Sequence, residues 1–288
     1  MTMDPLGEHR TRLFGLAYRM LGSRVEAEDV LQDAWLRIAA IDDMREPGPY
    51  LTTVVTRLCL DRLRAARARR EVYVGPWLPE PLVSEDELPP DAAIELADDI
   101  SFALLLALER LTPFERAAFL LHDVFDASFA EVSSVLGKSE VACRQLASRA
   151  RKAVRSERKV PTASREEHQR LLGSFFQAIA TGDVAGLKAV LHEDVVMLTD
   201  GGGVKLAALN PIYGRDKVAR FFIKIAAKSA RQWDDFTSRS ATINGLPALL
   251  VYFDGELDQV QSIAVDAGKI TAIYMVRNPE KLSHIRLN

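Results

Sequence analysis

The chain has 288 residues, which leaves room for two or three compact domains at about 100–200 residues each. Hydrophobic residues make up 48% and charged residues 27% of the sequence, close to ordinary globular usage, and this excludes wholesale disorder. The formal net charge of −3 argues against a nucleic-acid-binding protein, unless the charge is unevenly distributed along the chain.

Three further classes of protein are excluded by local features. The longest apolar runs, Phe102 to Leu108 and Leu246 to Phe253, are far shorter than the ~20 residues that span a bilayer. Residues 1–5 lack the basic and then apolar layout of a secretory signal. The two cysteines, Cys59 and Cys143, form no CxxC pair, so a disulfide framework and a cysteine zinc site are not expected. We therefore expect a soluble cytoplasmic protein with no membrane segment, no metal and no cofactor.

The charge is strongly uneven. Between Arg57 and Arg70 there are six arginines against one acid, and residues 76–100 hold eight acids and no base. Residues 138–159 carry a net charge of +6. The near-neutral total thus hides two basic segments on either side of an acidic one. Such basic segments repel themselves unless an anion such as a nucleic-acid backbone lies nearby.

Composition also indicates where the domains begin and end. The acidic segment carries four of the thirteen prolines between Pro79 and Pro90, which is typical of an extended linker. A second boundary falls at residues 160–164, where a basic helix ends. We therefore divide the chain into residues 1–75, an acidic proline-rich linker at 76–96, residues 97–158 and residues 165–288.

The first part is predicted to be helical throughout. Apolar residues at helical spacing predict a helix from Arg10 to Leu21, ended by Gly22, and a second from Val25 to Ala40, opened by Ser23. A third helix is predicted to start at Pro49 and to run into the arginines. The apolar face of the second helix is predicted to comprise Val30, Leu31, Ala34, Trp35 and Ile38.

The second part shows the layout of a helix-turn-helix. Predicted helices at 102–110, 114–125 and 128–136 are followed by the turn Gly137-Lys138-Ser139 and a last helix from Glu140 to about Arg155. We expect the last helix to bury Val141, Leu146, Ala150 and Val154. Its other face offers side chains suited to phosphates and base edges, namely Arg144, Gln145, Ser148, Arg149 and Lys152. A basic surface helix in an all-α domain is the alternative, but turn spacing and charge together favour DNA binding.

The third part reads as helices followed by strands. Helices are predicted at 168–180, then up to Leu191, and at 214–228. Strands are predicted at 195–198, 233–243, 248–253, 257–265 and 269–276. Asp254-Gly255 and Ala267-Gly268 are predicted hairpin turns.

Two segments resemble bacterial extracytoplasmic-function sigma factors. Glu28 to Arg37 resembles the region 2 segment that docks on the clamp helices of RNA polymerase. Leu111 to Arg116, and Phe129 to Val132 with Ser148 to Ala150, resemble region 4. The resemblance implies two all-α sigma domains, a region 2 helical bundle and a region 4 helix-turn-helix. It also implies RNA polymerase core, through its clamp helices and flap, and promoter DNA as partners.

Residue roles follow from that resemblance. The implied polymerase contacts are Asp29, Gln32, Asp33, Trp35 and Arg37. The implied contacts with the melted minus-ten strand are Met44, Arg45, Arg57, Asp61 and Arg62, since pockets and arginines suit unpaired bases and phosphates. The last helix of the second part would read the minus-35 element. Trp35 could equally be a core residue of the bundle.

The third part resembles a SnoaL-like, ketosteroid-isomerase-like cone, an α+β fold with a curved antiparallel sheet. Three motifs match sigma factors that carry such an extension: Trp77 to Pro81, Asp200 to Gly203, and Asn278 to Leu282. The family's glycine motif ends in lysine, whereas Val204 stands here and Lys205 comes one residue later. A regulatory interface is therefore expected at Trp77, Leu78, Pro79, Glu80, Asp200, Gly201, Gly202, Gly203, Asn278, Pro279 and Lys281.

Three roles for the third part remain open. An enzyme would need a general base in a pocket, and His192, Asp194, Asp200 and Asp254 are the candidates, although strand ends and turns explain all four. A ligand sensor would bind a small molecule that the sequence does not name. A structural regulator acting in cis is favoured, because glycines allow close backbone approach and Trp77 suits an interface. No dedicated anti-sigma factor is then expected. For the whole chain, the rivals are an isomerase- or hydrolase-type enzyme fused to a DNA-binding module, and a helix-turn-helix repressor.

Overall fold

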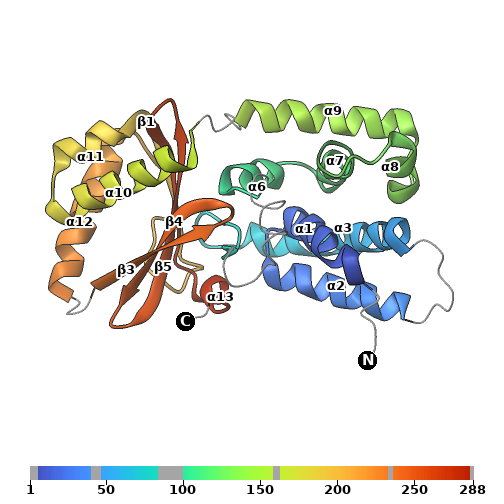
Figure 1. Cartoon of the computed structure of the whole chain (residues 1–288), viewed down its shortest axis with the longest axis horizontal. Coiled ribbons are helices and arrows are strands. Elements are labelled where there is room, and N and C mark those ends of the chain that lie inside the picture. Colours follow the sequence, from blue (N-terminus) through green and yellow to red (C-terminus); the bar gives the residue numbers. More distant parts are fainter. Residues whose placement is uncertain (1–5, 40–46, 84–99, 158–162, 233–235, 286–288) are drawn as a thin grey trace. The chain divides into compact units, whose positions relative to one another are not determined.

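The computed structural model (Figure 1) describes residues 6–39, 47–83, 100–157, 163–232 and 236–285. The chain divides into two compact units, each continuous in space but not in sequence. The helical unit comprises Met1–Val72 and Ala103–Arg158, and the C-terminal unit comprises Tyr73–Phe102 and Lys159–Asn288. The part of the predicted linker that the structure describes therefore belongs to the C-terminal unit. In the described ranges, no helix is long and apolar enough to cross a membrane.

The first helices of the helical unit are α1 (Arg10–Leu21), α2 (Arg24–Ile38) and α3 (Pro47–Glu71), with a short 3₁₀ turn, η1 (Gly7–His9), before them. Gly22 ends α1 in the left-handed conformation, with φ of 68°, as its position predicts. The Ser23 hydroxyl accepts a hydrogen bond from the Glu26 amide at 3.1 Å and opens α2. The third helix starts at Pro47 and not at Pro49. Pro49 still fits because the first-turn amides of a helix need no partner within it.

The remaining helices of this unit are α6 (Phe102–Glu109), α7 (Pro113–Phe119), α8 (Phe129–Leu136) and α9 (Glu140–Glu157). Capping boxes formed with Glu115 and Glu131 open α7 and α8, respectively. The single helix predicted at 114–125 is interrupted, because a π-helical turn, η2 (Leu120–Val124), follows α7. Its closing hydrogen bond runs from the Phe125 amide to the Leu120 carbonyl at 3.0 Å, one residue wider than in an α-helix.

The C-terminal unit is an α+β domain. Its helices are α10 (Arg165–Thr181), α11 (Val184–Val190), α12 (Arg215–Gln232) and α13 (Pro279–Leu282). Its strands are β1 (Leu191–Asp200), β2 (Ile212–Tyr213), β3 (Phe236–Ile243), β4 (Leu246–Phe253), β5 (Glu256–Asp266) and β6 (Lys269–Val276). They form one sheet in the order β2-β1-β6-β5-β4-β3.

The predicted α+β fold is confirmed, but its sheet is mixed, because one strand pair, β1 with β6, is parallel. Strands β3 to β6 form an antiparallel meander, but β6 returns beside β1 in the same direction. This parallel pairing brings the ends of both strands together, with Asp200 opposite Val276. The loop after β1 and the segment after β6 therefore start side by side.

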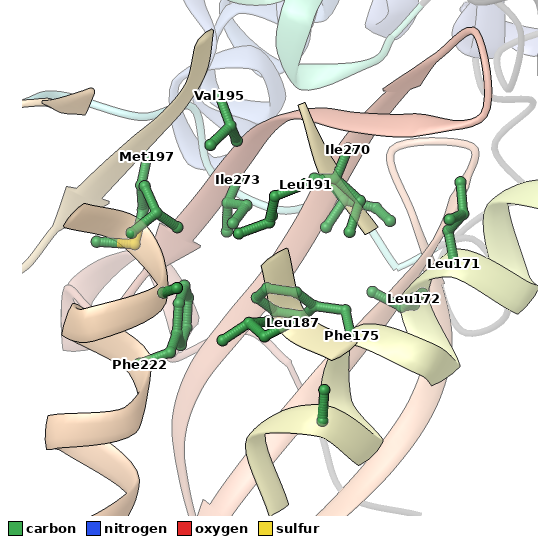
Figure 2. Close-up of a cluster of buried hydrophobic side chains, with 14 of the residues drawn as sticks. Leu171, Leu172, Phe175, Leu187, Leu191, Val195, Met197, Phe222, Ile270 and Ile273 are labelled. Carbon is green, nitrogen blue, oxygen red and sulfur yellow. The ribbon is translucent and has the colours of Figure 1, made fainter. Parts of the chain in front are cut away.

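Helices α10, α11 and α12 bury their apolar faces against one face of the sheet (Figure 2). Phe175 from α10 and Phe222 from α12 meet edge to face, with ring centroids 4.9 Å apart. Strand residues such as Leu249, Ile263 and Met275 complete this cluster. The space between helices and sheet is thus occupied by packed side chains, and the core holds the ends of β1 and β6 in place.

Candidate functional site

One face of α9 carries the residues predicted to read the minus-35 element. Arg144, Gln145, Ser148 and Arg149 line one hollow on the surface of the helix, together with Val141. Lys152 is exposed one turn further along. Among the residues predicted to be buried, Leu146, Ala150 and Val154 are buried, whereas Val141 is 63% exposed. The prediction for Val141 was wrong because it lies three, four and seven residues before members of the polar face, on the same side of the helix.

The Arg149 side chain is held by a carboxylate from another helix. Its Nε donates to Oε1 of Glu115 at 2.8 Å, and Glu115 also accepts hydrogen bonds from the amide and hydroxyl of Thr112. Partial burial raises the pKa of Glu115, but the bonds from Thr112 and Arg149 outweigh it, so the net pKa lies below its usual value. Glu115 therefore stays ionised and orients Arg149.

Other arginines of α9 are oriented in the same way. Arg144 donates to Glu140 at 2.7 Å, and its guanidinium lies 5.1 Å from the centroid of the Phe129 ring. Arg151 pairs with Asp123. The basic face is thus locally neutralised by carboxylates, and these exposed pairs are weak enough for a nucleic-acid phosphate to replace them.

The predicted polymerase contacts lie along α2. Asp29, Gln32, Trp35 and Arg37 are exposed, and Asp33 is partly exposed. Trp35 is 37% exposed and lies outside the buried stripe of α2, so the prediction that places it on the apolar face is wrong. Trp35 follows the buried Ala34 directly in sequence, and one residue further along a helix the side chain points about 100° away from the buried stripe. With Gln32, it lines a hollow at the surface.

The predicted minus-ten residues on α3 are engaged with neighbouring groups. Arg62 donates to Asp33 at 2.9 Å and to Asp29 at 3.3 Å, so it links the two predicted binding surfaces. Arg57 donates to the carbonyl of Val135 at 3.3 Å, at the C-terminal end of α8, where a helix favours cations. Asp61 pairs with Arg64 at 3.0 Å. Met44 and Arg45 lie outside the described residues.

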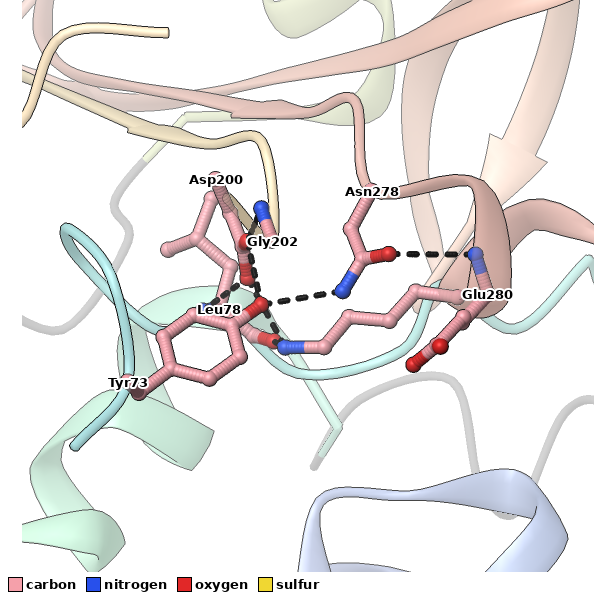
Figure 3. Close-up of polar contacts among 7 residues, drawn as sticks. Tyr73, Leu78, Asp200, Gly202, Asn278 and Glu280 are labelled. Carbon is pink, nitrogen blue, oxygen red and sulfur yellow. Dashed lines mark hydrogen bonds and ion pairs between the residues drawn. The ribbon is translucent and has the colours of Figure 1, made fainter. Parts of the chain in front are cut away.

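A cluster of polar side-chain and backbone groups, which we call the docking cluster, holds the start of the linker in the C-terminal unit (Figure 3). It comprises Tyr73, Leu78, Asp200, Asn278 and Lys281. Asp200 is fully buried at the end of β1. One carboxylate oxygen accepts from the Tyr73 hydroxyl at 2.6 Å, and the other from the Leu78 amide at 2.8 Å. A single buried carboxylate thus binds the side chain of Tyr73, just before the linker, and the backbone of Leu78 within it.

Lys281 supplies the charge that balances Asp200. Its Nζ lies 2.8 Å from the Asp200 carboxylate and also donates to the Leu78 carbonyl. It faces the rings of Trp77, at 4.2 Å, and Tyr73, at 5.0 Å. Lys281 is 6% exposed, so this ion pair is buried and its members depend on each other. Trp77 therefore contributes a cation–π contact in addition to apolar surface.

Asn278 joins the cluster to the last helix. Its Nδ2 donates to the Tyr73 hydroxyl at 3.0 Å, while its Oδ1 accepts from the Glu280 amide and caps α13. Burial first, and then the hydrogen bond to Asp200, raise the pKa of Tyr73 well above its usual value, so it remains a neutral donor.

The glycines after Asp200 allow the close approach. Gly202 has φ of 62° and donates to Asp200, and a Cβ there would lie 2.4 Å from Cγ of Asn278. At Gly201, a Cβ would lie 2.2 Å from the Lys205 carbonyl oxygen. Side chains at these two positions would therefore displace the loop from the cluster.

A second anchor for the linker, at Asn244, was not among the predicted interface residues. Asn244 accepts from the Leu82 amide at 3.0 Å and donates to the Ile100 carbonyl at 2.8 Å. The next linker residue, Val83, forms a β-bridge with Ile243. Asn244-Gly245 is a hairpin-turn dipeptide of the strongest kind, so the sequence contained the signal for the β3–β4 turn but not for its partner.

The remaining predicted interface residues make none of the docking-cluster hydrogen bonds described above. Pro79 is buried and Glu80 half-buried, whereas Gly203 and Pro279 are exposed. Val204, which replaces the expected lysine, is 71% exposed.

Lys205 pairs with Asp258 at 3.0 Å, and Arg277 also binds this carboxylate at 2.7 Å. The displaced lysine therefore takes part in an ion pair of its own and not in the docking cluster.

The candidate general bases lie at different places. Asp194 and Asp254 are exposed, and the Asp194 amide donates to the Nδ1 of His192 at 3.1 Å. Asp200 has its two carboxylate oxygens occupied by linker and protein donors. An ionised carboxylate in this arrangement acts as a structural acceptor, not as a proton acceptor for a substrate.

Comparisons with known proteins match both units. Residues 6–69 match the profile of sigma-70 region 2, and residues 101–154 match that of sigma-70 region 4. The chain is 40% identical over 284 residues to the ECF RNA polymerase sigma factor SigJ of Mycobacterium tuberculosis, covering 95% of this chain and 91% of that one. It is 31% identical to the probable sigma factor SigI of the same species, covering 96% and 93%. The crystal structure of SigJ superimposes with a TM-score of 0.80 at 38% identity, covering 97% of each chain.

Proposed function

This chain belongs to the extracytoplasmic-function RNA polymerase sigma factors, and from this we propose which of its surfaces act in promoter recognition and how its C-terminal unit regulates them. Members of this family are transcription initiation factors and not enzymes. The chain accordingly works with RNA polymerase core and promoter DNA.

The exposed face of α9 reads the minus-35 element, with Arg144, Gln145, Ser148, Arg149 and Lys152 as contacts. The support is its position after the turn of a helix-turn-helix, together with the exposure of these five side chains and the positive charge of three of them. Exposed residues of α2 contact the polymerase clamp, and Arg57, Asp61 and Arg62 on α3, with the loop of Met44 and Arg45, contact the minus-ten strand. In the free protein, Arg62 is shared with Asp29 and Asp33, so polymerase and DNA compete for one set of ion pairs.

The C-terminal unit regulates initiation in cis by holding the linker. The observation that carries this proposal is the docking of Tyr73 and Leu78 on the buried Asp200. The linker joins α3 to α6, and its docked residues cannot contribute to the reach between the two promoter-binding regions. Docking thus sets how far region 2 and region 4 can separate. Regulation of this kind needs no dedicated anti-sigma factor.

Run-off transcription with core polymerase tests the proposed surfaces. We expect promoter-dependent transcripts from templates selected out of a library randomised at both promoter elements, and loss of these transcripts when Arg149 and Lys152 are both replaced by alanine. Tight binding to duplex DNA without polymerase, together with repression and no transcript, would instead indicate a repressor. A catalytic activity that survives loss of the DNA contacts would indicate the fused enzyme.

The regulatory proposal is tested in the same assay with a matched pair of variants. Asp200→Ala removes the docking carboxylate, whereas Lys205→Met removes a lysine of the same unit whose acceptor, Asp258, keeps Arg277 as a partner. We expect Asp200→Ala to change transcript yield at saturating polymerase and Lys205→Met to leave it unchanged. Equal yields for wild type and Asp200→Ala would contradict regulation through the linker.

A further inference from the structure

The most exposed large apolar side chain in the described part of α9 stands at the start of the helix. Val141 is 63% exposed and occupies the second position after the cap formed by Ser139, whose hydroxyl accepts from the Ala142 amide at 3.2 Å. Valine is a weaker helix former than the residues that usually cover helix surfaces, so neither burial nor helix propensity accounts for it.

The neighbours of Val141 are polar and basic. Arg144, Gln145 and Ser148 follow it at intervals of three, four and seven residues, on the same side of α9, and line one hollow with it. Single exposed valines are common on protein surfaces. This one, however, lies among the side chains proposed to contact base edges, at the end of the helix that enters the major groove in a helix-turn-helix.

The arginines near Val141 have other partners and leave its side chain 63% exposed. Arg144 is drawn toward Glu140 and the Phe129 ring, and Arg149 toward Glu115. An apolar group pointing into the major groove has one apolar partner there, the 5-methyl of thymine, which distinguishes an A·T pair from the other pairs. Burying that methyl against a valine removes both groups from water.

We propose that Val141 is a specificity-determining residue of the minus-35 contact, which selects a thymine by packing its side chain against the 5-methyl group. This inference rests on the proposed role of α9. It adds an apolar contact to a surface that otherwise recognises DNA through hydrogen bonds and charge.

Deoxyuridine scanning tests it directly, because uracil differs from thymine only by the absent methyl. Holoenzyme with the full chain is assayed for open-complex formation on a selected promoter in which each thymine of the minus-35 element, on either strand, is replaced in turn. We expect one position at which uracil lowers complex formation by about fourfold, equivalent to about 0.8 kcal/mol, the value of one buried methylene-sized group. Val141→Ala should abolish this difference, while Arg149→Ala should weaken binding and keep it.

The outcomes separate the two proposals. If no thymine responds to demethylation in the wild type, or if Val141→Ala keeps the same thymine-to-uracil ratio, the role of Val141 is overturned while that of α9 stands. A loss of transcription in Val141→Ala that is equal on thymine and uracil templates also overturns it and indicates a protein contact. If Arg149→Ala leaves minus-35 recognition unchanged, the proposed function of α9 itself fails. Unfolding of Val141→Ala in urea at the wild-type midpoint confirms that the variant is folded.

Discussion

Asp200 shows how one buried side chain can serve two distant parts of the sequence. It ends β1, yet its oxygens bind Tyr73, just before the linker, Leu78 within the linker, and Lys281 from α13. Such a carboxylate is stable in a buried place because every acceptor position is used and a cation lies beside it. The mutual attraction of Asp200 and Lys281 therefore offsets the desolvation free energy of these two charges only while both side chains are present.

Removing the cation tests this dependence. We expect Lys281→Met to lower the free energy of unfolding of the C-terminal unit by about 3–5 kcal/mol, because it leaves Asp200 buried without its partner. Lys205→Met is the control. Lys205 is 42% exposed and its acceptor Asp258 retains Arg277, so a loss below about 1 kcal/mol is expected. Urea unfolding of the full chain measures both, and similar losses would contradict the special role of Lys281.

His168 makes the stability of the C-terminal unit depend on pH. It is buried on α10. Burial lowers its pKa to about 4, with a smaller contribution from the charge of Arg165, although a hydrogen bond with the Pro247 backbone acts in the opposite direction. The unfolded chain takes up the proton near pH 6.5, whereas the folded chain does so only near pH 4, so stability is lost as the pH falls through this window. We expect a loss of about 2 kcal/mol between pH 7 and pH 5. Urea midpoints across this range should fall less steeply for His168→Leu, and identical slopes would be inconsistent with a neutral buried histidine.

Among the elements, α9 carries two kinds of side chain that we propose as DNA contacts. The hydrogen bond to Glu115 holds the Arg149 guanidinium in one orientation. Lys152, about one helical turn further along α9, is exposed and has a flexible side chain. Planar, oriented guanidinium groups suit base edges, and flexible ammonium groups suit phosphates.

We therefore expect the two residues to respond differently to substitution. Arg149→Ala should cost about 1–3 kcal/mol on the selected minus-35 sequence and relax the preference at one base pair. Lys152→Ala should weaken binding about equally on all sequences and reduce the salt dependence of log K by about one unit. Titration of holoenzyme on matched and mismatched promoters at several salt concentrations measures both. If Arg149→Ala weakens binding equally on every sequence, Arg149 contacts a DNA phosphate and not a base.

At the scale of the whole molecule, the net charge of −3 describes no single part of the chain. The basic face of α9 and the arginines of α3 belong to the helical unit, whereas the described part of the linker belongs to the C-terminal unit. The proposed control of reach along the promoter therefore involves both units, because the DNA-contact residues lie in one and the docked part of the linker in the other.

Hydrogen exchange can follow the linker through initiation. The Leu78 amide is bonded to Asp200 and the Leu82 amide to Asn244, so both should be protected in the free protein. If undocking accompanies promoter binding, both amides should exchange faster in the complex with polymerase and promoter. Asp200→Ala should release Leu78 without releasing Leu82. Unchanged protection in the promoter complex would show that the linker stays docked.

The sequence by itself determined the elements and the family. Helical spacing, capping residues such as Ser23 and Gly22, and turn dipeptides such as Asp254-Gly255 act within a few residues, so they predict helices and hairpins directly. The same holds for the polar face of α9 and for the motifs that indicate a sigma factor with an extension.

Tertiary structure decided which residues these elements bring together. The parallel pairing of β6 with β1 places Asn278 and Lys281 next to Asp200. The hydrogen-bond partners of this carboxylate therefore come from segments that are distant from it in sequence. Likewise, Val141 and Trp35 are apolar by composition but exposed in the fold, because the packing of neighbouring helices decides which side of α9 and α2 is covered. Local patterns follow from short-range sterics and hydrogen bonding, whereas burial and partnership depend on contacts between segments that the sequence does not place side by side.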